Sequence, residues 1–321
     1  MTEMRIVATA PIDQVAIDIL QEVAPVETSP GPDEESMLKY LDSTIGIVCR
    51  GEGIVTRRMI EACPTLQVIG RPGVGYDSVD VKAATERNIP LVYAPVGGFA
   101  VAEGALALLL TLIKKIPLCD DAVKSGQWQK RYEFKSGDMT EHTLGIVGLG
   151  RIGSQLARLV QNFSMTVLAY DPIVTPDEAK ELGIELVELD ELIRKSDFIS
   201  LHVPLTGQTK GMINRESIAT MKKGAILVNL ARGGVVENLD VLADGLASGQ
   251  LAGVGLDVFP VEPPDISHRI FKDPRCVCAP HLLGTSELAM ERIFRTMATG
   301  MVAVLQGNLP EYCVNPNVFE S

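Results

Sequence analysis

Aromatic, histidine and basic residues are all scarce in this sequence. Aromatic residues make up 5% of the 321 residues, with a single tryptophan, and there are only four histidines. Lysine and arginine total 29 against 41 aspartate and glutamate residues, which gives a net charge of −12. Nucleic acid and anionic membranes require a basic surface, so we expect neither as a partner. A small anionic ligand is compatible with this charge, because a few arginines in one site outweigh a distant average.

Long hydrophobic runs, leader sequences and metal-binding patterns are also missing. The apolar run at residues 104–113 is about half of the roughly 20 residues that span a bilayer, which predicts a buried helix. No basic leader precedes a long apolar stretch at the N-terminus, so we expect a cytoplasmic protein without a secretory signal. The six cysteines include no C-x-x-C pair and no histidine at metal-ligand spacing, so we expect reduced, mostly packed thiols and no metal.

Short runs of β-branched residues alternate with amphipathic stretches along the chain. At roughly 100–200 residues per domain, this length predicts two domains. The predicted strands are residues 5–8, 45–48, 66–69, 91–93, 144–147, 166–169, 198–201, 225–228, 253–256 and 277–278. Strands between helical patterns predict βαβ units, so we expect an α/β fold with two Rossmann-like domains and parallel sheets. The border between the two arrays is expected at a helix over residues 100–115 and an irregular segment over 116–141.

The most informative motif is T-L-G-I-V-G-L-G-R-I-G-S-Q-L-A-R, an apolar strand followed by a glycine turn and a helix. In such a turn Gly148 bends the chain, Gly150 lets a pyrophosphate approach backbone N–H groups, and Gly153 packs the helix on the strand. The next strand ends at Asp171, close to the spacing of roughly 20 residues expected for a ribose-binding acid. We therefore predict a dinucleotide site, with a purely structural glycine turn as the alternative.

Asp171 determines which dinucleotide is expected. A carboxylate there accepts hydrogen bonds from ribose hydroxyls and repels a 2′-phosphate, and the following P-I-V-T provides no arginine to receive one. We predict NAD as the cofactor, not NADP. The alternative is that Asp171 only forms a turn before Pro172.

The last long helical pattern, residues 287–306, follows the final strand, and no third array of strands comes after it. We expect this helix to return to the first domain. The predicted arrangement is a discontinuous substrate-binding domain of residues 1–99 and 288–321, into which an NAD-binding domain of residues 100–287 is inserted.

Three strands of the second array are followed by residues suited to acid–base chemistry and anion binding. Arg232 lies in V-N-L-A-R-G-G-V-V, Glu262 in G-L-D-V-F-P-V-E-P-P, and His281 in A-P-H-L-L-G-T. Open parallel sheets bind ligands at the carboxyl ends of their strands, so we expect the three to converge at the nicotinamide end of the site. Taken singly, they could be a surface ion pair, a solvated acid and a hydrogen-bonded core histidine.

In their order and residue patterns, these motifs resemble those of the D-isomer-specific 2-hydroxyacid dehydrogenase family, and the resemblance covers essentially the whole chain. The family's H-x-P-L-T-x-x-T stretch is present as H-V-P-L-T-G-Q-T, and we expect its His202 to position the cofactor without transferring protons. The resemblance implies that Arg232, Glu262 and His281 are catalytic. It implies cofactor contacts at Gly148, Gly150, Arg151, Ile152, Gly153, Asp171, His202, Val203, Pro204, Thr209, Leu230, Ala231, Asp257, His281 and Gly284, with Asp257 on the carboxamide.

A second glycine cluster, V-I-G-R-P-G-V-G-Y-D, has Pro72 and the wrong spacing for a phosphate loop. The resemblance implies that its backbone N–H groups bind the substrate carboxylate. The expected substrate contacts are Arg50, Arg71, Gly73, Val74, Gly75, Gly97 and Arg232. Arg50 and Arg71 end neighbouring strands and are suited to a distal anionic group, with surface ion pairs as the alternative.

Within the family the chain most resembles the 3-phosphoglycerate dehydrogenase and hydroxypyruvate reductase-like members, through K-S-G-Q-W, A-Y-D-P-I and A-R-G-G-V-V-E. We expect no serine-sensing regulatory domain in it. Two stretches depart from the family pattern, because P-V-G-G-F-A lacks a polar Asn and Leu282-Leu283 replaces Ile-Gly after the histidine. Both are expected near the substrate, so the side chain of the substrate stays undetermined.

The resemblance implies an NAD-dependent enzyme that interconverts a small anionic D-2-hydroxy acid, such as 3-phosphoglycerate or glycerate, and its 2-oxo acid. In reduction, we expect His281 to protonate the carbonyl oxygen, Glu262 to orient the ring and Arg232 to bind the carboxylate. The rivals are an NAD-sensing corepressor-type binding protein and a phosphite dehydrogenase-like enzyme. A formate dehydrogenase fits less well, because the Glu262–His281 pair suits proton transfer at a hydroxyl.

The resemblance also implies a homodimer formed through the NAD-binding domain. Residues 116–141 are expected to reach across to the second copy, with Trp128 as an aromatic anchor of the kind interfaces favour. An exposed basic loop is the alternative for this segment.

Overall fold

The computed structural model describes residues 4–320 and separates them into two α/β units, each built on its own parallel sheet. The first unit combines the chain up to Gly97 with the segment from Thr285 onward, and the second unit is Gly98–Gly284. These bounds differ by two or three residues from the domain borders expected from the sequence. The α/β fold with two parallel sheets is confirmed, as is the return of the last helix to the first unit.

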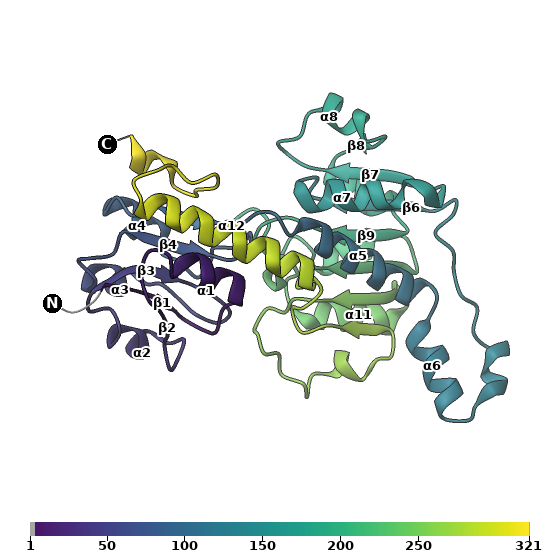
Figure 1. Ribbon diagram of the computed structural model, residues 1–321. Coiled ribbons are helices and arrows are strands. Elements are labelled where there is room, and N and C mark those ends of the chain that lie inside the picture. Colours follow the sequence, from purple (N-terminus) through teal and green to yellow (C-terminus); the bar gives the residue numbers. More distant parts are fainter. Residues whose placement is uncertain (1–3, 321) are drawn as a thin grey trace. The chain divides into compact units, whose positions relative to one another are not determined.

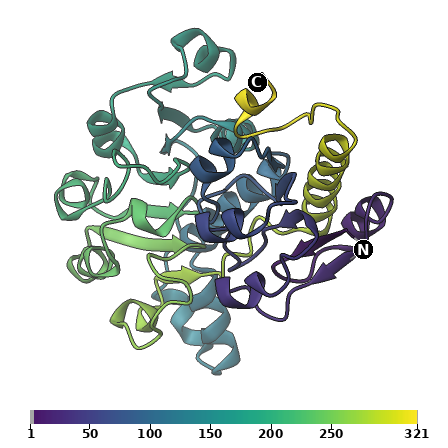
Figure 2. The ribbon, with the colours of Figure 1, turned by 90° about the vertical axis from the view of Figure 1, so that its left-hand side faces the viewer.

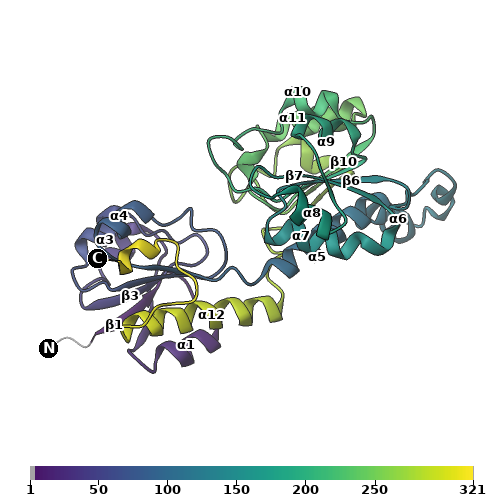
Figure 3. The same ribbon diagram turned by 90° about the horizontal axis from the view of Figure 1, so that it is seen from above.

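The first unit has a five-stranded parallel sheet in the order β2-β1-β3-β4-β5. Its strands are β1 (Arg5–Ala8), β2 (Val26–Thr28), β3 (Thr44–Val48), β4 (Val68–Arg71) and β5 (Leu91–Tyr93). Its helices are α1 (Gln14–Leu20), α2 (Glu34–Leu38), α3 (Arg57–Ala62), α4 (Val81–Glu86) and α12 (Glu287–Leu305). Figure 2 shows α12 (yellow) beside α1 (purple), although the two lie at opposite ends of the sequence. They cover one face of the sheet, and α3 and α4 cover the other (Figure 3).

The second unit has a seven-stranded parallel sheet in the order β12-β11-β10-β9-β6-β7-β8 (Figure 1). Its strands are β6 (Thr143–Val147), β7 (Thr166–Tyr170), β8 (Glu185–Leu186), β9 (Phe198–Leu201), β10 (Ala225–Asn229), β11 (Leu251–Leu256) and β12 (Cys276–Cys278). Its helices are α5 (Gly98–Ile113), α6 (Ile116–Lys124), α7 (Arg151–Val160), α8 (Pro176–Glu181), α9 (Leu189–Lys195), α10 (Arg215–Thr220) and α11 (Leu239–Ser248). The strand order reverses at β6, which lies between β7 and β9, and such switch points are where open α/β sheets bind ligands.

Helices cover both faces of the second sheet, as Figure 3 shows, with α5 and α7 on one side and α9, α10 and α11 on the other. Helix α7 buries Gly153, Leu156, Ala157 and Val160, the spacing of a single helical face. The central strands β6, β9, β10 and β11 are therefore buried on both sides, which is why they form continuous apolar runs in the sequence. Because all seven strands are parallel, their carboxyl ends share one edge of the sheet, which we call the carboxyl edge. The opposite edge is the amino edge.

The sequence analysis missed two strands and a helix. β2 and β8 have only three and two residues, and each includes a glutamate, Glu27 and Glu185, so they leave no apolar run to detect. The prediction of an irregular segment over residues 116–141 was wrong in its first part, because this segment begins with helix α6 and contains a 3₁₀ turn at Trp128–Tyr132. Pro117 stands in the first turn of α6, where the missing N–H group breaks no hydrogen bond.

The apolar run at residues 104–113 belongs to α5, which packs against the sheet and against α7. Within residues 4–320, no helix combines the length and apolar character needed to cross a membrane. All six cysteines are free thiols, and four of them are at least partly buried. Cys119 and Cys278 are the two exposed ones, so the thiols are mostly packed, as expected.

Candidate active site

The predicted cofactor and catalytic residues of the second unit follow strands at its carboxyl edge. They are the glycine turn after β6, Asp171 after β7, His202 to Pro204 after β9, Leu230 to Arg232 after β10, Asp257 after β11, and His281 after β12. Strand pairing alone thus brings residues that are distant in the sequence to one edge, for example Asp171 beside the turn at Leu149.

The glycine turn after β6 is closely packed on its inner side and open on its outer side. Gly148 has a φ of 95°, and a Cβ there would lie 2.8 Å from the backbone carbonyl group of His202. A Cβ on Gly153 would lie 2.1 Å from the carbonyl oxygen of Gly148. At Gly150, in contrast, a Cβ would meet no atom within 4 Å, and helix α7 begins directly after it without a side-chain cap. The start of α7 is thus open on this side, and helix N-termini bind anions.

Asp171 connects the glycine turn to the end of β7. Its Oδ2 accepts a hydrogen bond of 2.8 Å from the backbone N–H of Leu149, and its Oδ1 accepts one of 2.9 Å from Ile173. A carboxylate has about four lone-pair sites, so it can also accept from a ribose hydroxyl. The turn-forming role that the sequence left as an alternative is therefore present, and it is compatible with ribose binding.

His281 and Glu262 form a hydrogen-bonded pair. The ring Nδ1 lies 2.8 Å from Oε2 of Glu262, and Oε1 of the same carboxylate accepts a 2.9 Å hydrogen bond from the N–H of Phe259. This bond leaves the ring Nε2 as the nitrogen that can face a substrate. His281 has a φ of 54°, a left-handed conformation that is uncommon outside glycine and that clusters at functional sites.

Asp257 holds the loop that carries His281. It is buried, 3% exposed, and its Oδ1 accepts hydrogen bonds from the N–H groups of Leu282 (2.9 Å) and Leu283 (3.3 Å). Burial raises the pKa of Asp257, and the two N–H donors oppose that rise. Sequence reasoning predicted only a carboxamide contact for this residue. The structure adds that its carboxylate fixes the backbone on the C-terminal side of His281.

Arg232 follows β10 in a turn shaped by a fully buried asparagine. Asn229 accepts from the N–H of Ala231 and donates to the carbonyl oxygen of Arg232, both at 3.0 Å. A Cβ on Gly233 would lie 1.9 Å from the carbonyl carbon of Phe259. The loop that carries Arg232 therefore touches the loop that positions Glu262, and only glycine allows this approach.

His202 lies beneath the glycine turn with its ring nitrogens shielded from solvent. Its Nε2 is 2.8 Å from Oγ of the fully buried Ser200, while its Nδ1 has no hydrogen-bond partner among residues 4–320. Burial lowers the pKa of His202 to about 4, so the ring is neutral at physiological pH and unsuited to donate a proton. This geometry supports the expected positioning role.

Residues 106–282 match the profile of the D-isomer specific 2-hydroxyacid dehydrogenase, NAD binding domain. The match covers more than half of the chain and includes the glycine turn, Asp171, Arg232, Glu262 and His281. The chain belongs to the D-isomer specific 2-hydroxyacid dehydrogenase family. Its second unit contains the NAD-binding domain of that family, so the predicted cofactor is confirmed as NAD.

Relatives of this dehydrogenase-family chain cover it almost completely. It is 39% identical to the D-3-phosphoglycerate dehydrogenase of Methanocaldococcus jannaschii over 98% of the chain and 60% of that relative. The chain spans about 60% of the length of the curated relatives it matches. A protein from Thermus thermophilus with a known crystal structure is 32% identical in sequence to this chain. The two structures match with a TM-score of 0.86 over 97% of this chain and 100% of the other. D-Lactate dehydrogenase from Aquifex aeolicus, complexed with NAD and lactic acid, is 29% identical, with a TM-score of 0.86 and coverage of 97% and 99%.

The carboxyl edge of this family member has the features that NAD requires. The open side of Gly150 and the uncapped start of α7 form a cradle for a pyrophosphate, and Asp171 stands where a ribose is expected. The unpartnered Nδ1 of His202 is a buried polar atom in the same region. No group of three or more metal-ligating side chains occurs in the described part of the chain.

The remaining predicted substrate residues lie in the first unit. Arg71 donates from Nε to the carbonyl oxygen of Gly75 (2.9 Å) and from Nη1 to that of Cys49 (3.1 Å), so it braces the second glycine cluster. Val74 in this cluster is 47% exposed and Gly73 has a φ of 107°. These contacts neither require nor prevent a substrate at the cluster, and the substrate roles remain predictions.

Two further residues of the first unit have structural contacts that the sequence did not indicate. The guanidinium of Arg50 lies over the ring of Phe294, 5.0 Å from its centroid, and donates to the carbonyl oxygen of Pro11. A Cβ on Gly97 would lie 2.5 Å from Cδ1 of Ile293, so this glycine makes room for α12. Neither set of contacts could be read from sequence spacing, because the partners lie in distant parts of the chain.

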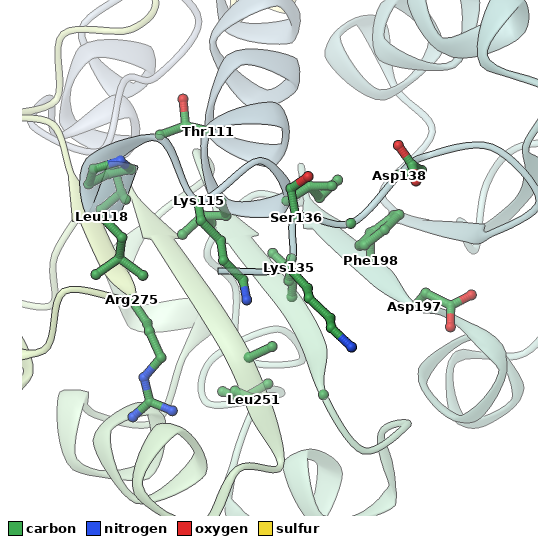
Figure 4. Close-up of a pocket in the computed structure, with 18 of the residues that line it drawn as sticks. Thr111, Lys115, Leu118, Lys135, Ser136, Asp138, Asp197, Phe198, Leu251 and Arg275 are labelled. Carbon is green, nitrogen blue, oxygen red and sulfur yellow. The ribbon is translucent and has the colours of Figure 1, made fainter. Parts of the chain in front are cut away.

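The amino edge of the second sheet contains a cavity of about 620 Å³, shown in Figure 4. Its lining includes Lys115 and Lys135, which point into it, together with Asp138, Phe198 and Leu251. The strands β9, β10, β11 and β12 begin at this cavity, so it lies at the end of the sheet opposite His281 and Glu262. No sequence motif pointed to it, and none of the predicted site residues lines it.

Proposed function

We propose that this protein is an NAD-dependent dehydrogenase that interconverts a small anionic D-2-hydroxy acid and its 2-oxo acid. The observation that carries the proposal is the 2.8 Å hydrogen bond between His281 and Glu262. A histidine oriented by a carboxylate is a general acid–base pair, and here it shares a sheet edge with a dinucleotide-binding turn. When bound, NAD supplies the hydride acceptor for oxidation, and NADH supplies the hydride for reduction.

The protein's own groups have separate tasks in this reaction. His281 donates a proton from Nε2 to the carbonyl oxygen in reduction and accepts it back in oxidation. Glu262 holds the ring through Nδ1 and stabilises its charged form. Arg232 binds the substrate carboxylate and polarises the carbonyl, a task that suits the fixed fork of a guanidinium. Asp257 keeps the His281 loop in place through Leu282 and Leu283.

A panel of 2-oxo acids tests the reaction class and narrows the substrate. Phosphohydroxypyruvate is the first to test, because many relatives are named D-3-phosphoglycerate dehydrogenases. The panel continues with hydroxypyruvate, glyoxylate, pyruvate, sulfopyruvate and branched 2-oxo acids, each with NADH. Steady turnover of any of them supports the enzyme. Tight NADH binding without turnover of any would instead favour an NAD-sensing binding protein, and turnover of phosphite with NAD would favour the phosphite reaction.

Asp171 supports a preference for NADH over NADPH. A 2′-phosphate would be placed against its carboxylate, and an unfavourable contact of about 1.4 kcal/mol corresponds to a tenfold loss. We expect kcat/KM for NADH to exceed that for NADPH by about tenfold or more. Replacing Asp171 by serine and Ile173 by arginine should shift the preference toward NADPH. Equal use of both cofactors by the unmodified protein would count against the role of Asp171.

A homodimer is part of the proposal, with the segment 116–141 as the arm between copies. Trp128 is 57% exposed and Tyr132 71% exposed, and Arg131 lies over both rings. Exposed aromatic and arginine side chains of this kind anchor interfaces. Light scattering should give about twice the chain's mass, and Trp128→Ala should lower it toward the monomer. A location in the cytoplasm is likewise proposed, and cell fractionation would test it.

A further inference from the structure

Two cysteines lie side by side on the edge strand β12, three residues before His281. Cys276 and Cys278 are separated by one residue in an extended strand, so their side chains project from the same face of the sheet. Their sulfur atoms are 3.6 Å apart. β12 is the last strand in the sheet order, so one of its sides has no neighbouring strand. The expectation of reduced, mostly packed thiols did not single out this pair.

The two thiols differ in environment. Cys278 is exposed and Cys276 is half-buried. The hydrogen-bonding contact between the two sulfur atoms lowers the pKa of Cys278 and, together with burial, raises the pKa of Cys276. Cys278 is thus the accessible thiol with thiolate character, and Cys276 is poised beside it as a resolving thiol.

A disulfide between these positions is feasible and strained. At a rise of about 3.3 Å per residue, alternate residues of a strand have Cα atoms roughly 6.6 Å apart. Disulfides usually join Cα atoms separated by about 4.4–6.8 Å, so this pair is near the upper limit. Bonding must draw the strand together between the two cysteines, and a strained disulfide of this kind is easily reduced.

We propose that Cys276 and Cys278 are a reversible redox pair, oxidised by peroxides to an intrastrand disulfide. The Cys278 thiolate attacks one oxygen of the peroxide, the O–O bond breaks, and hydroxide leaves and takes up a proton to become water, giving a sulfenic acid. The sulfur of Cys276 then attacks the sulfenic sulfur, loses its proton and expels a second water. Both sulfurs are oxidised, hydrogen peroxide is reduced to two waters, and a dithiol reductant reverses the change by exchange.

The disulfide is connected to the proposed site through the backbone of β11 and β12, and this part of the inference rests on the proposed function. Cys278 pairs with Leu256 in the parallel ladder, and the N–H of Ala279 donates to the carbonyl oxygen of Leu256 at 2.8 Å. Leu256 precedes Asp257, and Ala279 and Pro280 lead to His281. Contraction of β12 therefore displaces Ala279, which leads into the His281 loop. It also displaces Leu256, which precedes Asp257, the residue that holds the other side of this loop. We expect a fall of about tenfold in kcat, because displacements of about 1 Å in a catalytic group can cost about 10²-fold.

Mass spectrometry of the whole protein tests the pair without any assay of activity. The protein is treated with hydrogen peroxide, blocked with N-ethylmaleimide and cleaved with trypsin, which cuts after Arg275 and Arg292 and so places both cysteines in one peptide. We expect this peptide to be unlabelled and lighter by the mass of two hydrogen atoms, and dithiothreitol before blocking should restore two labels. Two labels after peroxide, or sulfinic acid in place of the disulfide, would overturn the proposal.

Matched variants separate the pair from ordinary thiol oxidation. Cys276→Ser removes the resolving thiol, so Cys278 should progress to sulfinic acid, whereas Cys119→Ser removes an exposed cysteine elsewhere and should leave the disulfide unchanged. Disulfide formation at an unaltered rate in Cys276→Ser, through a different cysteine, would also overturn the pairing. If the disulfide forms but no oxo acid is turned over before or after peroxide, the proposed function fails and the redox pair stands.

Discussion

The amino edge and the carboxyl edge of the seven-stranded sheet differ in the groups that they present. The amino edge has a cavity of about 620 Å³, whose lining residues Asp138 and Asp197 form ion pairs with Lys114 and Lys222. The carboxyl edge has the hydrogen-bonded His281–Glu262 pair, a buried carboxylate and a glycine turn that opens to the start of a helix. The cavity and the acid–base pair therefore lie at opposite ends of the strands within one domain. The dinucleotide-binding turn lies at the carboxyl edge because α7 begins there, directly after the end of β6.

A histidine at each edge illustrates the difference. His142 stands just before β6 at the amino edge and stacks on Phe198, with ring centroids 5.5 Å apart. His281 stands after β12 in a left-handed backbone conformation, bonded to a carboxylate that is itself oriented by a backbone N–H. His142 thus has a packing role. In His281, the hydrogen bond to Glu262 fixes Nδ1 and leaves Nε2 for proton transfer.

The largest effect is expected for His281→Asn. General acid–base catalysis typically contributes about 10²–10⁴-fold, so kcat should fall by about 10³-fold while the Kd for NADH changes by less than about threefold. Steady-state kinetics and fluorescence titration measure the two quantities. His142→Asn is the matched control at the amino edge and should keep its kcat. Comparable losses in both variants would show that the edges are not functionally distinct.

His202 should make the protein less stable in acid. Its folded pKa of about 4 lies below the ordinary value near 6.5, so the unfolded chain binds more protons between these values. The free energy of unfolding should thus fall as the pH drops from about 6.5 to about 4, by at most roughly 3 kcal/mol from this group.

Urea unfolding of the wild type and His202→Gln between about pH 7 and about pH 4.5 measures that slope. The variant should have a flatter pH dependence, whatever its stability at neutral pH. His142→Asn is again the control and should retain the wild-type slope. Parallel curves for wild type and His202→Gln would assign the acid sensitivity to other groups.

Glu262→Gln is expected to have a smaller effect on kcat than loss of the histidine. Glutamine keeps the size of the side chain and a hydrogen-bonding oxygen but removes the charge that stabilises the protonated ring. Because the pair is partly exposed, solvent screens the interaction, and we expect kcat to fall by about 10- to 10²-fold. Asp138→Asn, which removes an exposed carboxylate paired with Lys114 at 2.6 Å, is the control and should leave kcat unchanged.

Much of this architecture could be predicted from the sequence, because buried parallel strands are continuous apolar runs and the glycine turn has a fixed spacing. The strands β2 and β8 could not, since each is short and includes a glutamate, so neither forms an apolar run. The charged residues of the carboxyl edge were found because each follows a predicted strand.

The contacts that hold those charged residues were not predicted. Asp257 binds the N–H groups of Leu282 and Leu283, and backbone donors leave no mark in residue types. The contact between the loops of Gly233 and Phe259 depends on how closely two loops approach in space. Asn229 and Gly233 are present in the motif around Arg232, yet their roles follow only from this geometry.

The smallest effect is expected for Lys223→Ala at the amino edge. Lys223 lines the cavity and forms no ion pair with any other residue of the range 4–320. Substitutions at such surface positions usually change stability by less than about 0.5 kcal/mol, and no group near Lys223 has a role in the proposed reaction. We therefore expect kcat/KM within about twofold of the wild type and a free energy of unfolding unchanged within about 0.5 kcal/mol. Lys223→Glu makes the test stricter, because it reverses the charge beside the cavity without changing the carboxyl edge. If either variant lost activity tenfold while remaining folded, the cavity would be coupled to the site, and the functional separation of the amino edge from the carboxyl edge would be wrong.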